Sequence, residues 1–220
     1  MFSIAEKLNE NNQTVFLKKE EIYLSDENVR YEQIGKVIYL MASPSKHHDS
    51  IVFEIGRQLG TYLLDKSCKV YPPTLGLDLK AFVPSLKDLD SFKEFFKKKI
   101  EADKEDAIYL YPDILVICDN ADDNFGYHGY KKVPKMIGEV YSPSTGGRDL
   151  GVKKSIYEFI GVEEYWVIHD IRNVSVFLLQ NGKYVQKEYQ IDIEEQGILE
   201  VPVSVFSDFV INFDPRIINW

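Results

Sequence analysis

Residues 136–169 decide the fold, and they read MIGEVYSPSTGGRDLGVKKSIYEFIGVEEYWVIH. An apolar run at 136–141 is followed by small and polar residues, then by an amphipathic stretch at 149–160 and a second apolar run at 165–169. Apolar residues recur at helical spacing in the middle stretch, whereas the flanking runs are short and mostly apolar, with Glu139 inside the first. Gly161 is typical of a helix C-terminus. The stretch therefore predicts strand, helix, strand.

The residues on either side extend this pattern. The run DILVIC at 113–118 predicts a strand buried on both faces. Ile51, Ile55 and Leu59 recur every fourth position and predict a helix over 47–64, with Ser45 as its N-cap. Further segments predict short helical pieces over 1–27, a hairpin over 29–42, broken strand structure over 68–83, a loop over 119–132, and a hairpin over 174–189 around Asn181-Gly182. Together they indicate an α/β fold with a mixed sheet flanked by helices.

Length and composition favour one globular domain over residues 1–220. The chain weighs 25.5 kDa, and its 45% apolar and 28% charged residues exclude disorder as the main state. No apolar run approaches the ~20 residues of a membrane span, and the N-terminus lacks a secretion signal. We therefore expect a cytoplasmic protein that does not associate with a membrane. The net charge of −9 argues against wide, nonspecific wrapping of nucleic acid, although a carboxylate-rich nuclease site would itself contribute negative charge.

The two cysteines, Cys68 and Cys118, both lie in apolar surroundings. In a reducing compartment, two buried thiols fit better than a disulfide bridge.

Two carboxylates fall within or beside predicted buried strands. Asp113 opens the run 113–118, and Glu139 is flanked on its strand by apolar residues and glycine. An ionised carboxylate is costly there unless a cation or strong donors meet it. If the strands are neighbours, both acids can point to one place near a strand end and supply oxygen ligands to Mg²⁺. The alternative is a turn residue and an edge-strand charge.

A lysine on the following helix could reach the same place. Asp149, Lys153 and Tyr157 are spaced by four, so they lie along one flank of the helix. This flank begins near the end of the strand that carries Glu139. An ammonium there could orient water or stabilise charge on a phosphate. The alternative is an Asp149–Lys153 pair at the surface.

Other motifs offer less support for a specific chemistry. No G-x-S-x-G, P-loop or G-x-G-x-x-G pattern occurs in the sequence. His47 and His48 precede a helix and are more typical of a capping or surface pair than of ligands. His128 and His169 have no partner at zinc-binding spacing.

Several separated motifs together resemble a known family. In chain order they are Pro112-Asp113, the run GEVYSPST at 138–145, Asp149, Lys153, Tyr157, Gly161-Val162 and Glu164-Tyr165-Trp166. The pattern resembles the Uma-type restriction endonuclease family of the PD-(D/E)XK nuclease superfamily. The resemblance covers roughly residues 29–190, including Glu32 and Gly35 in the first hairpin.

The resemblance implies a restriction-endonuclease-like fold and a metal-dependent endonuclease that hydrolyses DNA. By position, Asp113 and Glu139 would hold Mg²⁺ or Mn²⁺ with help from the Val140 carbonyl. The superfamily's usual lysine position is Tyr141 here, and Lys153 would replace that lysine. Asp149 and Tyr157 would support Lys153, and Glu32 would lie at the edge of the site.

Two departures from the family pattern leave alternatives open. His169 stands where the family usually has an aspartate, which leaves the role of this position open. Residues 84–106 resemble an inserted amphipathic helix with a Lys-rich face; the sequence favours packing of this helix on the sheet by its phenylalanines over contact with nucleic acid or a second subunit. Without the usual lysine, the chain could instead be an inactive binding or assembly module with the nuclease fold. An enzyme that acts on RNA or a nucleotide is a third possibility. Cleavage of both DNA strands would favour a homodimer.

Overall fold

The computed structural model describes residues 4–8, 14–18, 30–35, 37–88, 92, 107–192 and 197–218. The chain divides into two compact units. The first comprises Met1–Ser43, Gly76–Tyr111 and Phe125–Lys132, and the second comprises Pro44–Leu75, Pro112–Asn124 and Val133–Trp220. One domain spanning residues 1–220 stays a prediction. No helix among the described residues is long and apolar enough to cross a membrane.

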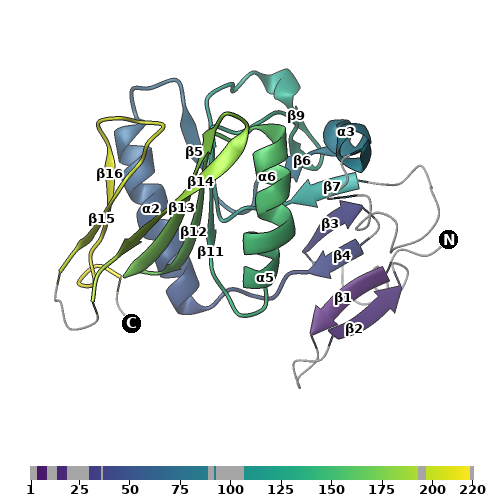
Figure 1. The fold of residues 1–220 in the computed structure, drawn as a ribbon, viewed down its shortest axis with the longest axis horizontal. Coiled ribbons are helices and arrows are strands. Elements are labelled where there is room, and N and C mark those ends of the chain that lie inside the picture. The colour runs from purple at the N-terminus through teal and green to yellow at the C-terminus, as the bar shows by residue number, and fades with distance from the viewer. Residues whose placement is uncertain are drawn as a thin grey trace. The chain divides into compact units, whose positions relative to one another are not determined.

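The first unit is built on a sheet whose described strands run in the order β2-β1-β4-β3-β7-β6-β10-β9 (Figure 1). The predicted hairpin is confirmed, since β3 pairs antiparallel with β4, and Gly35 has the positive φ of 62° that glycine adopts readily. Its strands are β1 (Ile4–Leu8), β2 (Thr14–Lys18), β3 (Tyr31–Gly35), β4 (Val37–Leu40), β6 (Leu77–Asp78), β7 (Ala107–Leu110), β9 (Phe125–Gly126) and β10 (Gly129–Tyr130).

Three predictions require comment in and around this unit. The described parts of residues 1–27 are strands, so the prediction of helices is wrong there: β1 pairs antiparallel with β2 and parallel with β4. The predicted loop over 119–132 contains a 3-10 turn, η2 (Asp122–Asn124), and the short pair β9–β10. The predicted inserted helix over 84–106 lies largely outside the described residues, although the described α3 (Val83–Asp88) overlaps its start.

The second unit places helices on both faces of a mixed sheet (Figure 1). Its strand order is β14-β13-β12-β11-β8-β5, and β11 runs parallel to β12 but antiparallel to β8. The strands are β5 (Lys69–Tyr71), β8 (Ile114–Ile117), β11 (Met136–Val140), β12 (Glu164–Asp170), β13 (Asn173–Gln180) and β14 (Lys183–Gln190). A separate pair is formed by β15 (Leu199–Pro202) and β16 (Val210–Phe213).

Helix α2 (Lys46–Tyr62) covers one face of this sheet. The predicted cap is confirmed, because the Ser45 hydroxyl accepts from the backbone N–H of His48 at 3.1 Å. Ile51, Ile55 and Leu59 are at most 1% exposed and pack in the core with residues of β8, β11 and β12. The periodicity of the helix thus explains which face it buries.

The opposite face carries a broken helix formed by α5 (Gly146–Arg148), η3 (Asp149–Lys153) and α6 (Lys154–Ile160). Gly161 ends it as predicted, with φ 93° in the left-handed region. The predicted hairpin of β13 and β14 is also confirmed, with Asn181 and Gly182 both at positive φ in the turn.

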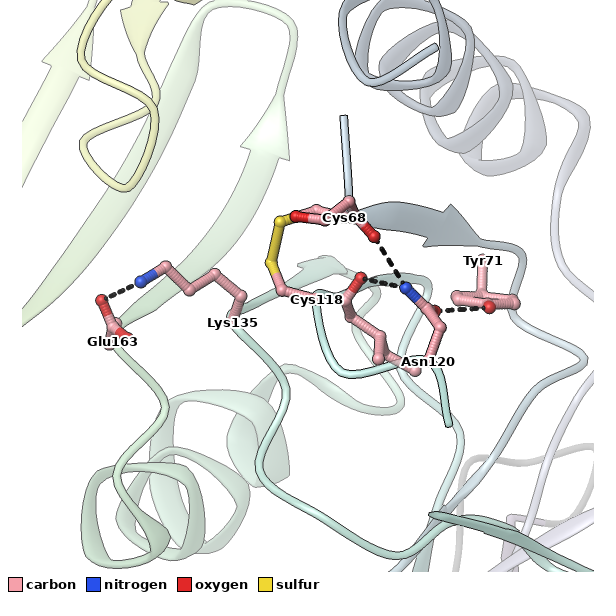
Figure 2. The surroundings of a disulfide bond; sticks show 8 residues. Cys68, Tyr71, Cys118, Asn120, Lys135 and Glu163 are labelled. Atoms are coloured by element: carbon pink, nitrogen blue, oxygen red, sulfur yellow. Dashed lines mark hydrogen bonds and ion pairs between the residues drawn. A yellow bond between two sulfur atoms is a disulfide. The ribbon is translucent and has the colours of Figure 1, made fainter. Parts of the chain in front are cut away.

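The cysteine prediction is wrong. Cys68 and Cys118 form a disulfide between the end of β8 and the start of β5 (Figure 2). The register explains the pairing: Lys69 lies opposite Ile117, so the next residues outward face each other. Asn120 links the same two segments by hydrogen bonds: it donates to the Ser67 carbonyl at 2.8 Å and accepts from the Tyr71 hydroxyl at 2.8 Å.

Candidate active site

The two predicted acids lie where β8 begins and where β11 ends. The antiparallel ladder ends at the pair Ile114–Gly138, so Asp113 comes one residue before the paired part of β8 and Glu139 one residue after the paired part of β11. Glu139 is buried in the last part of β11, and Asp113 lies just before β8 with a side chain that is 14% exposed.

Asp113 is held by two hydrogen bonds from different elements. Its Oδ2 accepts from the backbone N–H of Val140 at 2.9 Å and from Nε2 of His48 at 3.1 Å. Burial lowers the pKa of His48, but hydrogen bonds and charges from Asp113 and Asp49 outweigh it, so the pKa of His48 is raised. Asp113 is therefore bound to the backbone N–H of Val140, the residue that follows Glu139.

Glu139 meets the predicted lysine. Lys153 Nζ lies 2.5 Å from Glu139 Oε1, and the Tyr157 hydroxyl donates to the same oxygen at 3.1 Å. Glu139 and Lys153 are each only 3% exposed, and Tyr157 is fully buried. A buried carboxylate requires such compensation, because desolvation of an unpaired ion costs several kcal/mol. We call Glu139, Asp149, Lys153 and Tyr157 the lysine cluster.

Asp149 completes the lysine cluster and is not at the surface. Its Oδ1 lies 3.4 Å from Lys153 Nζ, and the residue is 1% exposed. The Tyr165 hydroxyl donates to the Asp149 backbone carbonyl at 3.0 Å. Burial raises the pKa of Tyr165 well above its usual value, and the charges of Glu139 and Asp149 add to the shift. Tyr165 therefore stays a neutral hydrogen-bond donor.

The helix that carries Lys153 is kinked. The sequence predicts a continuous helix over 149–160, but Gly151 adopts φ −106° and ψ −105°, which are not helical, so the helix is interrupted there. Asp149 lies before the kink and Lys153 after it, and both residues are buried.

Tyr141 occupies the position two residues after Glu139, where a lysine from the strand would otherwise lie. Its ring is 38% exposed and packs directly over Gly146, where a Cβ atom would overlap it. Tyr141 therefore fills this position with an aromatic ring, and the ammonium that pairs with Glu139 belongs to Lys153.

Glu32 belongs to the first unit. It is 3% exposed on β3, and its Oε1 accepts from the Tyr111 backbone N–H at 3.0 Å. Its place at the edge of the site stays a prediction.

His48 is the residue that sequence reasoning undervalued. Its position after Ser45 indicated a role in capping, and its backbone N–H does bind the cap. Its side chain nevertheless reaches Asp113, which lies 65 residues away along the chain. No local signal predicts this contact, because it depends on how α2 packs on the sheet.

The donor set suits a hard divalent cation only with help from other ligands. Asp113 and Glu139 would supply carboxylate oxygens, and the Val140 carbonyl would be a third oxygen of the type that Mg²⁺ accepts. In the described part of the chain, no group of three His, Cys, Asp or Glu residues is arranged to hold a metal ion. Water or substrate phosphate would have to complete the coordination shell, as Mg²⁺ often requires.

Comparison with known proteins identifies the chain's family. The model of the Uma2 family, described as "Putative restriction endonuclease", matches residues 17–212. The chain therefore belongs to the Uma2 family, as its motifs suggested.

A solved structure shows the same fold. It is titled a "putative nuclease belonging to DUF820" from Anabaena variabilis ATCC 29413, and it matches with a TM-score of 0.58 and 15% identity over 88% of this chain and 93% of that chain. The predicted restriction-endonuclease-like α/β class is thus confirmed. A search of curated proteins finds no match.

Proposed function

We propose that the protein is a cytoplasmic, metal-dependent endonuclease that hydrolyses phosphodiester bonds in DNA. One observation carries the proposal: Glu139 pairs with the Lys153 ammonium at 2.5 Å, and the N–H of the next residue, Val140, donates to Asp113 at 2.9 Å. Two acids and one ammonium at a strand end are the residue types that phosphodiester hydrolysis needs. Membership of a family described as restriction endonucleases supports the same substrate.

Each residue has a separate task in this proposal. Asp113 and Glu139, with the Val140 carbonyl, would hold Mg²⁺ or Mn²⁺, which supplies Lewis-acid chemistry when bound. Lys153 would then turn its ammonium toward the scissile phosphate and stabilise charge there. Asp149 and Tyr157 hold the lysine and Glu139 in place, and His48 orients Asp113. A homodimer would supply the two sites that cleavage of both strands needs.

Plasmid cleavage tests the assignment. Wild type, Asp113→Asn, Glu139→Gln and Lys153→Met are incubated with supercoiled plasmid and Mg²⁺, and the melting temperature of each is measured alongside. Asp119→Asn serves as the matched control, because Asp119 is an exposed acid on the loop after β8. We expect cleavage by wild type and the control only. Equal cleavage by all five proteins would show that the assigned roles are wrong.

A second candidate is a nuclease-fold binding module without activity. The observation that favours it is the burial of the lysine cluster: Glu139 and Lys153 are each 3% exposed, and both are paired within the cluster. Calorimetric titration with Mn²⁺ separates the two candidates. Binding heat that is lost in Asp113→Asn supports the enzyme, whereas no heat with wild type supports the module. A panel of RNA and DNA substrates then tests whether another phosphodiester is preferred.

A further inference from the structure

His169 lies at a break in the strand pairing of the second unit. Ile168 pairs with Val174 and Asp170 pairs with Asn173, so His169 is an extra residue on β12 with no partner position on β13. This is a β-bulge, a feature that re-aims a side chain and is over-represented beside active sites. From the sequence, His169 is only a departure from the family pattern, at a position where an aspartate is usual, and it has no partner at metal-binding spacing.

The imidazole of His169 is tied into a chain of hydrogen bonds. Its Nε2 lies 2.9 Å from the Ser175 hydroxyl, which in turn donates to both carboxylate oxygens of Glu188 at 2.9 and 3.0 Å. Ser175 has one proton, and an ionised carboxylate only accepts. Ser175 therefore accepts from His169, so Nε2 carries the proton and Nδ1 is the basic nitrogen of the neutral ring.

The hydrogen-bond chain lies on the same face of the sheet as Glu139. Glu139 pairs with Val167 across β11 and β12, Val167 pairs with Ser175, and Ser175 pairs with Glu188. These residues form one row across four strands. The contact of the His169 imidazole with Ser175 keeps it on this face despite the bulge, near the end of β12 that pairs with the end of β11.

Tyr141 packs against this histidine. The ring centroids of Tyr141 and His169 are 5.5 Å apart with an interplanar angle of 39°. The Tyr141 backbone N–H also donates to the Ile168 carbonyl at 2.8 Å, which continues the pairing of β11 with β12. The ring that replaces the strand lysine thus borders the half-buried imidazole.

Ser175 itself is a poor candidate for a nucleophile. It is 3% exposed within β13, and its proton is directed to Glu188 and not to the histidine. A nucleophilic serine needs the imidazole as its proton acceptor, which is the reverse of the direction found here. The chain of hydrogen bonds is arranged to orient His169.

We propose that His169 is a catalytic residue whose Nδ1 accepts a proton from the attacking water. This inference rests on the proposed phosphodiester hydrolysis. Water gives one proton to Nδ1, its oxygen forms a bond to phosphorus, and the bond from phosphorus to the leaving oxygen breaks. The leaving oxygen takes a proton from solvent, and the imidazolium returns its proton to solvent. Ser175 and Glu188 are positioning residues that hold the Nε2–H form.

Nitrogen NMR tests the geometry without any cleavage. Long-range ¹H–¹⁵N spectra distinguish the two neutral forms of a histidine, and the chain has only four histidines to assign. We expect His169 in the Nε2–H form in wild type and a mixture of both forms in Ser175→Ala and Glu188→Gln. An Nδ1–H form in wild type would overturn the proposal.

Single-turnover cleavage tests the chemistry. His169→Gln retains an amide N–H that can donate to Ser175 but lacks a basic nitrogen, so it separates orientation from proton transfer. We expect it to lower the rate by about 10²-fold or more with an unchanged KM, and Ser175→Ala to lower it about tenfold. His128→Gln, a change in the first unit, should match wild type. Wild-type rates in His169→Gln would overturn the base alone, whereas no cleavage by wild type would overturn the proposed function and the base together.

Discussion

Two buried glutamates on neighbouring strands of the second unit are stabilised in different ways. Glu139 on β11 is paired with the Lys153 ammonium at 2.5 Å. Glu164 on β12 is fully buried and is met by neutral donors: the Trp166 indole N–H at 2.7 Å and the backbone N–H groups of Ser204 and Val205 at 3.1 and 2.7 Å. The first carboxylate is paired with a cation, whereas the second accepts only from neutral N–H donors.

We expect this difference to separate a carboxylate that serves the proposed chemistry from one that serves stability. Burial raises the pKa of Glu164, although its three hydrogen bonds oppose the shift. Its partners come from its own strand and from the segment after β15, so it ties that segment to the sheet. Lys153 can be redirected to a substrate, because side-chain ammonium groups are mobile donors, but backbone N–H groups cannot. We therefore expect Glu139 to govern chemistry and Glu164 to govern stability.

The largest effect is expected from Lys153→Met. The change leaves Glu139 buried without its cation, which should destabilise the fold by about 3–5 kcal/mol. It should also lower the cleavage rate by about 10²–10³-fold. Adding Glu139→Gln should restore part of the stability, but none of the activity. Urea unfolding of both single variants and the double variant gives the coupling energy. Additive losses of stability would show that the two side chains do not interact.

Reduction of the disulfide should lower stability with little effect on the chemistry. Cys68 and Cys118 are 50 residues apart in sequence, and closing a loop of that length stabilises a fold by about 4 kcal/mol in the chain-entropy model. The bridge joins the end of β8 that is remote from Asp113. We expect both the double variant Cys68→Ser/Cys118→Ser and the reduced wild type to melt at a lower temperature than the oxidised wild type. Both should retain the wild-type cleavage rate at temperatures below their melting temperatures. An unchanged melting temperature on reduction would contradict this expectation.

Glu164→Gln should cost stability alone. An amide can accept through only one oxygen, so at least one of the three N–H donors loses its partner, and we expect a loss of about 1–3 kcal/mol. The cleavage rate should stay at the wild-type value. Urea unfolding at neutral pH measures the loss of stability. A change in cleavage rate without a change in stability would reverse the roles assigned to Glu139 and Glu164.

The smallest expected effect is a pH dependence of the stability that Glu164→Gln loses relative to wild type. The pKa of Glu164 is raised in the folded protein, so the folded state binds its proton more tightly than the unfolded state does. The resulting stabilisation is present below the unfolded pKa and is lost as pH rises through the folded pKa. The gap in unfolding free energy between wild type and Glu164→Gln should therefore widen toward acidic pH. A gap that narrows instead would contradict the raised pKa.

The sequence predicts those parts of the fold whose signals are local. The continuous apolar runs predict β8 and β11, and the four-residue spacing predicts α2 and the helix that carries Lys153. That spacing also identified Asp149 and Tyr157, although not their burial. The acids were recognised because ionised groups are rare within buried strands.

Features that depend on distant pairing could not be predicted. Residues 4–8 become a strand because β4 and β2 supply hydrogen-bond partners, and a five-residue segment carries little signal of its own. Cys68 and Cys118 meet through the register of β5 and β8. The bulge at His169 and the reach of His48 to Asp113 likewise arise only when strands and helix are packed.

One comparison of rates tests the central claim most directly. Single-turnover cleavage of a labelled DNA duplex with Mg²⁺ is measured for wild type, Glu139→Gln and Glu164→Gln at a temperature where all three are folded. We expect wild type and Glu164→Gln to cleave at the same rate and Glu139→Gln to be slower by about 10²-fold or more. Equal rates for all three proteins would contradict the assignment of Glu139 to a nuclease site.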